Sequence, residues 1–207
     1  GGSKVAKLKS IKNESMLRSI DIAMEKDGVA LTRFFMMVER DHPKGELTEL
    51  ILSERLREIR LSDPSCVDES FASILGFKEH GAIIHYEATE ESNIPVVGDG
   101  LLLVDSGGQY IYGTTDITRT VALGTPTAEE IHDYTLVLKG HIAIANAVFP
   151  EGTTGHQLDA MARQYLWKEG KAYYHGTGHG IGFFINCHEG PQSIRLNINP
   201  TPLEVGM

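Results

Sequence analysis

Two aspartates at the ends of apolar segments are the first residues in this sequence whose positions suggest chemistry. Asp105 directly follows the apolar run Leu101–Val104, which is typical of a buried strand. A carboxylate in such a setting is costly unless it is paired or bound to a metal ion. Asp116 lies beside Ile117 in a threonine-rich stretch of strong strand propensity. Two strands joined through the intervening glycines can bring both carboxylates to one place.

Two histidines follow in the glycine-rich segment His175-Gly-Thr-Gly-His179. Their i, i+4 spacing is that of zinc-binding helices, but a helix through these glycines would cost about 1 kcal/mol per glycine. In an extended chain four residues span about 13 Å, and imidazoles that far apart cannot share one metal ion at bond lengths of about 2 Å. The two histidines must therefore have different roles. Two carboxylates and one imidazole form a hard-to-borderline set of metal ligands without thiolate.

The elements that must position these residues alternate between helices and strands, which indicates an α/β (α+β) fold. In the first half of the chain, apolar positions with a period of 3.6 predict a helix that is capped by Asn13 and continues to about Val38. A second helix is expected over about 46–60. Short strands are expected over 71–75 and 82–85, before the strands that carry the aspartates.

Capping boxes mark two helices in the second half of the chain. The box that begins at Thr127 predicts a helix to about Phe149, and the box that begins at Thr154 predicts the next one. On this last helix, Asp159 and Arg163 have i, i+4 spacing and are expected to form an intrahelical ion pair. Glycine-rich strands then carry the histidines.

The composition is that of an ordinary globular protein. The chain has 207 residues, of which 41% are hydrophobic and 23% charged, enough for one domain or one domain with a small extension. Its net charge of −9 and the absence of a basic stripe argue against a nucleic-acid partner. No apolar stretch approaches the length of a membrane span, so no membrane partner is expected. Cys66 and Cys187 do not form a disulfide framework, and we expect reduced thiols in a cytoplasmic protein.

Four motifs surround the candidate residues: Asp105-Ser-Gly-Gly-Gln-Tyr110, Gly113-Thr-Thr-Asp-Ile-Thr-Arg119, His175-Gly-Thr-Gly-His179-Gly-Ile-Gly182 and His188-Glu-Gly-Pro191. Together they resemble the motifs of aminopeptidase P, the family of Xaa-Pro aminopeptidases. The similarity extends from about Ile11 to Met207 and is greater to the longer, multidomain members than to the short bacterial ones. The resemblance implies a pita-bread fold, in which helices cover a curved antiparallel sheet. It also implies a site for two divalent metal ions and the removal of an N-terminal residue that precedes proline.

The resemblance further implies a role for each candidate residue. Asp105 would chelate one metal ion, Asp116 would bridge both, and His179 would ligate one. His85 and His188 match histidines that bind the substrate and stabilise the tetrahedral intermediate, whereas His175 matches a histidine that lies behind the metal ligands or beside the substrate. An imidazole is well suited to donating a hydrogen bond to a developing oxyanion near neutral pH. The other histidines match nothing catalytic and are expected to be surface or structural residues: His42, His80, His132, His141 and His156.

Manganese is the expected metal, with cobalt, zinc and iron as alternatives. The expected partner is a peptide with an Xaa-Pro N-terminus, and a homodimer is left open. Taken singly, the aspartates have a simpler explanation, because Asp commonly caps backbone amides in turns. Prolidase, which has the same fold and metals but acts on Xaa-Pro dipeptides, is the alternative enzyme. A metal-free peptide-binding module of the same fold is the alternative from a different class.

Both ends of the sequence are typical of a fragment. Gly1-Gly-Ser3 without an initiating Met is typical of an artificial scar, and Pro202–Met207 resembles the turn before another strand. We therefore expect residues 1–10 to be a scar and interdomain linker, and residues 11–207 to be a C-terminally incomplete catalytic domain. The family's general acid/base glutamate and its two ligand glutamates have no match here, so the fragment by itself is expected to be inactive.

Overall fold

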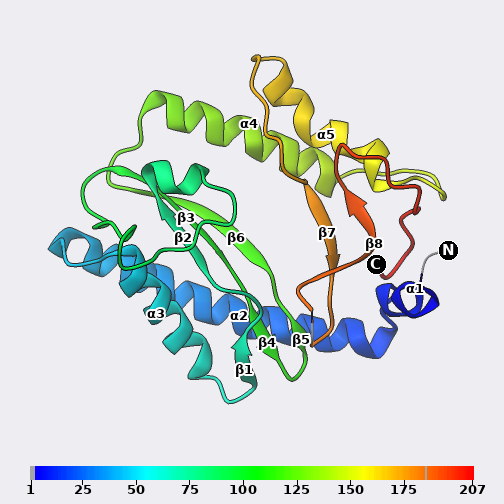
Figure 1. Ribbon diagram of the computed structural model, residues 1–207, viewed down its shortest axis with the longest axis horizontal. Helices are drawn as coiled ribbons and strands as arrows, with labels where there is room; N and C mark the ends of the chain where they lie inside the picture. Colours follow the sequence, from blue (N-terminus) through cyan, green and yellow to red (C-terminus); the bar gives the residue numbers. More distant parts are fainter. Residues whose placement is uncertain (1–2, 185) are drawn as a thin grey trace. The chain divides into compact units, whose positions relative to one another are not determined.

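The computed structural model describes residues 3–184 and 186–207. The chain forms two compact units, whose elements are labelled in Figure 1. We call them the aspartate unit, which comprises Glu14–Pro126 and Phe183–Cys187, and the histidine unit, which comprises Gly1–Asn13, Thr127–Gly182 and His188–Met207.

Two helices form one layer of the aspartate unit. The predicted first helix is confirmed as α2 (Glu14–Asp41), and a short 3-10 turn, η1 (His42–Lys44), follows it. The second is α3 (Glu49–Leu61), which begins later than expected because Thr48 supplies its cap: the Thr48 hydroxyl accepts a hydrogen bond from the Ile51 N–H at 3.2 Å.

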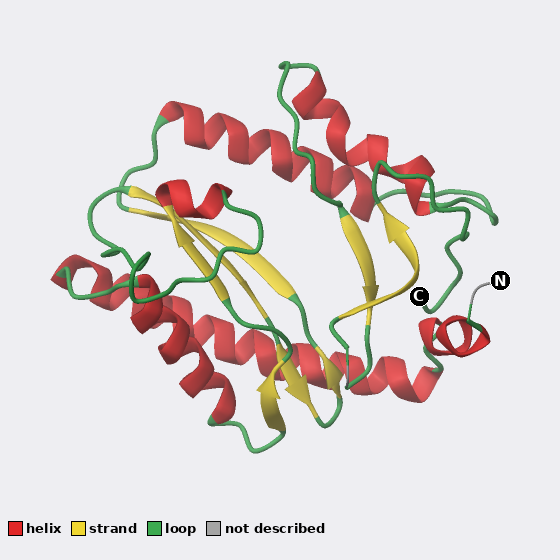
Figure 2. Cartoon of the chain, viewed as in Figure 1, coloured by secondary structure: helices red, strands yellow, loops and turns green. Residues whose placement is uncertain are grey.

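Antiparallel strands form the other layer of this unit (Figure 2). β3 (Gly100–Ser106) pairs with β2 (Ile74–Phe77) on one side and with β6 (Ile117–Leu123) on the other. A smaller sheet contains β1 (Cys66–Glu69), β4 (Gly108–Tyr110) and β5 (Gly113–Thr114). The core lies between β3 and the helices, where Leu102 and Val104 pack with Phe34 and Leu52. Because side chains alternate along a strand, this packing directs Asp105 away from that core.

The prediction of a strand over 82–85 is wrong. The chain forms a 3-10 helix, η2 (Lys78–Ala82), and then a turn in which the Tyr86 N–H donates to the Ile83 carbonyl at 3.2 Å. Glycine allows this fold-back, because a Cβ on Gly76 would lie only 2.6 Å from the Gly81 nitrogen. Ile83 stays 51% exposed, so the apolar character of this segment does not mark a buried strand.

A buried polar cluster ties the helices of the aspartate unit to its smaller sheet. The Asp27 carboxylate accepts hydrogen bonds from Arg60 Nε at 2.7 Å, from Arg60 Nη2 at 3.1 Å and from the Tyr110 hydroxyl at 2.9 Å. Asp27 and Tyr110 are buried, as is the guanidinium. Because these groups come from α2, α3 and β4, the cluster fixes the strand that leads toward Asp116.

The histidine unit contains the remaining elements: α1 (Lys4–Ser10), α4 (Ala128–Ala145), α5 (Gly155–Trp167), β7 (Gly178–Ile181) and β8 (His188–Ile194). α1 lies within the segment expected to be a scar and linker, and it packs on β8. α4 and α5 pack closely at Gly140, where a Cβ would lie 2.1 Å from the Ala162 carbonyl oxygen.

Both helices begin where the capping boxes predict. In the first box, the Glu130 N–H donates to the Thr127 hydroxyl at 3.2 Å and Glu130 Oε2 accepts from the Thr127 N–H at 2.7 Å. α4 ends at Ala145, before the expected Phe149, and Asn146 is its C-cap. Phe149 itself precedes a proline, a position that disfavours helical geometry. Among the helices of the described residues, none combines the length and the apolar character needed to cross a membrane.

Candidate metal centre and active-site histidines

Asp105 and Asp116 lie on neighbouring strand ends of the aspartate unit. Asp105 pairs with Thr118 across β3 and β6, and the Thr118 hydroxyl donates to Asp105 Oδ1 at 2.7 Å. Asp116 directly precedes β6, two positions before Thr118. Residues two positions apart share one face of a strand. The two carboxylates therefore project from the same side, and both are half-buried.

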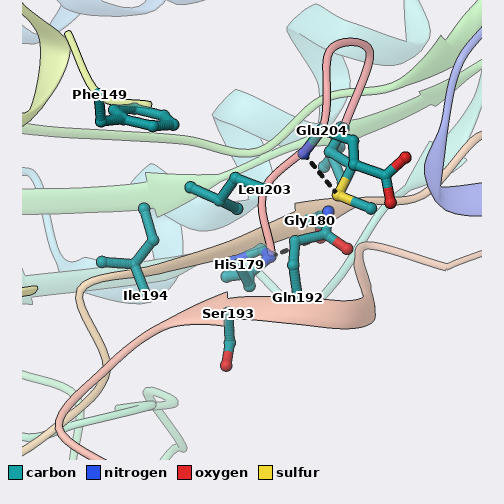
Figure 3. A pocket seen from close by; sticks show the side chains of 10 residues that line it. Phe149, His179, Gly180, Gln192, Ser193, Ile194, Leu203 and Glu204 are labelled. Atoms are coloured by element: carbon teal, nitrogen blue, oxygen red, sulfur yellow. Dashed lines mark hydrogen bonds between the residues drawn. The ribbon is translucent and has the colours of Figure 1, made fainter. Parts of the chain in front are cut away.

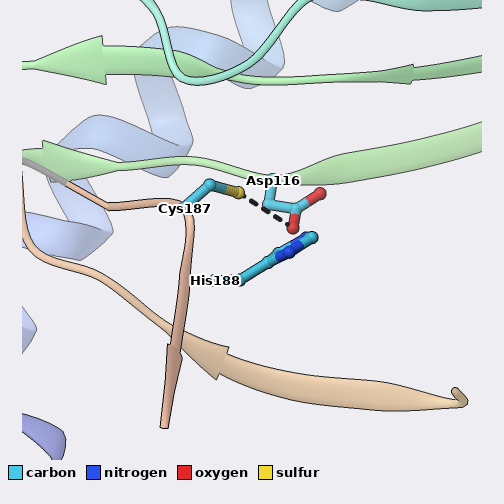
Figure 4. A group of neighbouring side chains, drawn as sticks. All are labelled: Asp116, Cys187 and His188. Carbon is cyan, nitrogen blue, oxygen red and sulfur yellow. Dashed lines mark hydrogen bonds between the residues drawn. The ribbon is translucent and has the colours of Figure 1, made fainter. Parts of the chain in front are cut away.

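A thiol that the sequence did not single out lies at these carboxylates. Figure 4 shows Cys187, whose Sγ donates to Asp116 Oδ2 at 3.2 Å. Burial raises the pKa of the Cys187 thiol, and the hydrogen bond and charge of Asp116 and the charge of Asp105 raise it further. The thiol therefore stays protonated and acts as a donor.

Close backbone packing behind Asp105 explains the glycines of its motif. A Cβ on Gly107 would lie 1.9 Å from the Thr115 carbonyl oxygen, so no larger residue fits there. The Gly108 N–H donates to the Thr115 hydroxyl at 2.8 Å, and the Ser70 hydroxyl donates to the Thr115 carbonyl at 2.8 Å. These contacts hold the chain that leads from Asp105 to Asp116.

His85 lies in the turn that replaces the expected strand. It is exposed and has a φ of 55°, which is uncommon for a residue other than glycine. Its flanks are held by the fully buried Glu49, whose carboxylate accepts from the Phe77 N–H at 2.9 Å, from His80 Nδ1 at 2.9 Å and from the Tyr86 hydroxyl at 2.7 Å. His80 is thus structural, as predicted. Glu49 was not among the residues that the sequence singled out.

His179 and His188 face each other in the histidine unit. They lie on the antiparallel strands β7 and β8, and their ring centroids are 4.0 Å apart at an interplanar angle of 61°. His179 Nδ1 donates to the Gly180 carbonyl oxygen at 2.8 Å, because a carbonyl can only accept. In a neutral imidazole the lone pair is then on Nε2, the arrangement typical of a metal-ligating histidine.

A cavity of about 320 Å³ adjoins His179 within the histidine unit (Figure 3). Phe149 and Leu203 supply apolar walls, and Gln192 supplies a buried amide. Gly180 is required beside it, since a Cβ there would lie 2.2 Å from the Glu189 carbonyl oxygen. His175 is exposed, and its ring lies 4.8 Å from that of Tyr173.

The two units divide the candidate residues between them. The aspartate unit carries His85, Asp105 and Asp116, and the histidine unit carries His175, His179 and His188. A common centre for Asp105, Asp116 and His179 stays a prediction, as does a common cleft for the three other histidines.

Comparison with known proteins agrees with the resemblance seen in the motifs. Aminopeptidase P2 of Arabidopsis thaliana is 47% identical over 207 residues, which cover 99% of this chain and 29% of the relative. The solved X-prolyl aminopeptidase of Caenorhabditis elegans, described as a cytosolic enzyme with a di-nuclear active site, is 37% identical with a TM-score of 0.92 and is matched over 99% of this chain and 33% of its own. The Xaa-Pro dipeptidase of Bacillus anthracis is 28% identical with a TM-score of 0.85 over 98% of this chain and 54% of its own.

The chain spans about a third of the length of the curated relatives it matches, 34% and 29% in two cases. Its mixed α/β architecture, with antiparallel sheets and helices, is the pita-bread fold of these structural neighbours. Residues 18–207 match the model of one protein family. The chain therefore belongs to metallopeptidase family M24.

Proposed function

We propose that the complete protein is a metal-dependent exopeptidase that removes the N-terminal residue from peptides with proline in second position. The observation that carries the proposal is the position of Asp105 and Asp116 on one side of β3 and β6, where the Cys187 thiol donates a hydrogen bond to Asp116. Two carboxylates on the same side of neighbouring strands repel each other, and bound cations would offset that repulsion. The names of the similar proteins support the substrate class.

The donors present fit divalent cations. Asp105 would bind one cation, Asp116 would bridge two, and His179 would bind through Nε2, which its hydrogen bond to Gly180 favours. Hard carboxylates and one imidazole suit manganese, and cobalt, zinc and iron are the alternatives. When bound, such cations polarise a scissile carbonyl and activate water.

The remaining histidines would act on the substrate. His85, His175 and His188 would bind the peptide and donate hydrogen bonds to the oxyanion that develops on its carbonyl. Each would contribute to turnover without holding metal. Two divalent cations carry four positive charges, whereas Asp105 and Asp116 supply two negative ones. The family's ligand glutamates and its general acid/base glutamate have no match among the motifs of this chain, which spans about a third of its relatives' length; we propose that they lie outside these 207 residues.

The cellular setting is also part of the proposal. Free thiols at Cys66 and Cys187 support a reducing compartment, and we propose the cytoplasm. A homodimer is the assembly to be tested by sedimentation of the complete protein.

Peptide hydrolysis by the complete, manganese-loaded protein tests the activity. We expect cleavage of a tripeptide with proline second, and loss of manganese and of activity in Asp116→Asn. Asp21→Asn, which changes an exposed aspartate on α2, is the matched control. Cleavage of Xaa-Pro dipeptides alone would favour prolidase, to which the similarity to a dipeptidase also points. A protein that binds peptide but no metal would contradict the proposal and favour a binding module.

Calorimetry with manganese tests the proposed missing ligands. The 207-residue chain should bind manganese weakly and cleave no peptide, whereas the complete protein should bind two ions tightly. Tight binding of two ions by the short chain, with turnover, would show that these residues contain the whole site.

A further inference from the structure

The ion pair on α5 is completely buried. Arg163 Nε donates to Asp159 Oδ2 at 2.6 Å, and both side chains are 1% exposed, which confirms the predicted intrahelical pair. Exposed pairs with this spacing contribute little to a helix, and burial adds a desolvation cost. Helix stability alone therefore does not account for a pair in this position.

Both partners also bind the segment that carries His175. Arg163 Nη1 donates to the Tyr173 carbonyl, and Arg163 Nη2 donates to the His175 carbonyl at 2.8 Å. The guanidinium carbon lies 3.9 Å from the centroid of the Tyr173 ring. The planar fork of arginine thus holds two carbonyls on either side of Tyr174, and lysine cannot reproduce that geometry.

Asp159 holds the other end of the same segment. Its Oδ1 accepts a hydrogen bond from the Thr177 hydroxyl at 2.5 Å, and Thr177 Oγ1 lies 2.6 Å from the Tyr173 hydroxyl. The backbone is thereby fixed on both sides of His175, while the imidazole itself is exposed.

We propose that Arg163 and Asp159 are positioning residues that hold His175 in the orientation needed for catalysis. The inference rests on the proposed function, in which His175 acts on the substrate. An imidazole that donates to a developing charge must be held close to its productive geometry, and a displacement of about 1 Å can cost about 100-fold in rate. A rigid, buried ion pair beneath an exposed side chain meets that need.

A double-mutant cycle in the complete, metal-loaded protein tests the inference. Arg163→Lys should lower kcat about 10- to 100-fold while KM stays within about twofold and metal content is unchanged. In a His175→Gln background the same change should lower kcat by less than about twofold, because Arg163 acts through His175. Arg18→Lys, in the exposed i, i+4 pair with Glu14, is the matched control and should leave kcat unchanged. If Arg163→Lys does not fold, Asp159→Asn takes its place in the cycle.

An equal loss of kcat in both backgrounds would overturn the inference, because the Arg163–Asp159 pair would then affect turnover without acting through His175.

Amide exchange and carbethoxylation of histidines provide a measurement that needs no substrate. Arg163→Lys should speed exchange over 173–177 and change the reaction rate of His175 but not that of the exposed His141. An unchanged carbethoxylation rate at His175 in Arg163→Lys would contradict the inference, whichever peptides the protein cleaves. Changed rates in a protein that cleaves no Xaa-Pro peptide would mean that the proposed function fails while the coupling of Arg163 to His175 stands.

Discussion

The Thr118 hydroxyl of β6 donates a hydrogen bond of 2.7 Å to Asp105 Oδ1 at the end of β3. The two residues are direct cross-strand partners, so the pairing of β3 with β6 sets this contact. A hydrogen bond from Thr118 restrains the orientation of the Asp105 carboxylate. Thr118 is thus a candidate partner that orients Asp105, the residue that we propose as a metal ligand.

Removing the Thr118 hydroxyl should weaken metal binding. We expect Thr118→Val to lower manganese affinity of the complete protein about 10- to 100-fold, because the Asp105 carboxylate loses its orientation. Thr118→Ser, which keeps a hydroxyl, should restore affinity. Thr120→Val, two positions further along β6, is the matched control. Calorimetric titration with manganese measures the effect, and equal affinity in Thr118→Val and Thr118→Ser would contradict it.

Two glycines should respond to alanine in opposite ways. Gly107→Ala would place a Cβ 1.9 Å from the Thr115 carbonyl oxygen, and we expect a loss of about 2 kcal/mol or more in unfolding free energy. Gly28 lies inside α2, and apart from its chain neighbours and the backbone of its own helix no atom of the described residues lies within 4 Å of its Cβ position, so Gly28→Ala should stabilise by about 0.5–1 kcal/mol. Urea denaturation of the complete protein compares the variants. A neutral Gly107→Ala would show that the chain between the aspartates can relax.

The buried pair Arg60–Asp27 should matter far more than an exposed pair. Arg60→Met leaves the Asp27 carboxylate buried with an incomplete set of donors, and we expect a loss of about 3–5 kcal/mol in unfolding free energy. Arg55→Met, which breaks an exposed pair with Glu58 on the same helix, should cost less than about 1 kcal/mol. Thermal and urea unfolding provide the measurement. Equal losses of unfolding free energy in Arg60→Met and Arg55→Met would mean that burial does not determine how much an ion pair contributes to stability.

The Asp63 carboxyl should give a stability contribution that disappears in acid. Hydrogen bonds from Lys26 and Ser65 lower the pKa of Asp63 to about 2, below its ordinary value of about 3.9. Since the unfolded chain then binds the proton more readily, the contribution is fully present above about pH 4 and falls as pH drops toward 2. We expect the urea midpoints of the wild-type protein and Asp63→Asn to differ at pH 6 and to converge near pH 2. A difference that is independent of pH would contradict this account.

The sequence by itself determined the local elements and the family. Periodicity and capping residues located α2, α4 and α5, because helix formation depends on contacts within a few residues. The motifs around Asp105 and His179 identified the family, because they are contiguous in the chain. The ion pair of Asp159 with Arg163 was also predictable, since i, i+4 neighbours meet in any helix.

Only the tertiary structure decided what these local features contact. The strand expected over 82–85 failed because the chain folds back on β2 through glycines, which apolar character does not reveal. Three hydrogen bonds join residues that are separated in sequence. They link Tyr86 to Glu49, Arg163 to the His175 carbonyl, and Cys187 to Asp116. Such contacts depend on the register and packing of whole elements, so no pattern within one segment encodes them.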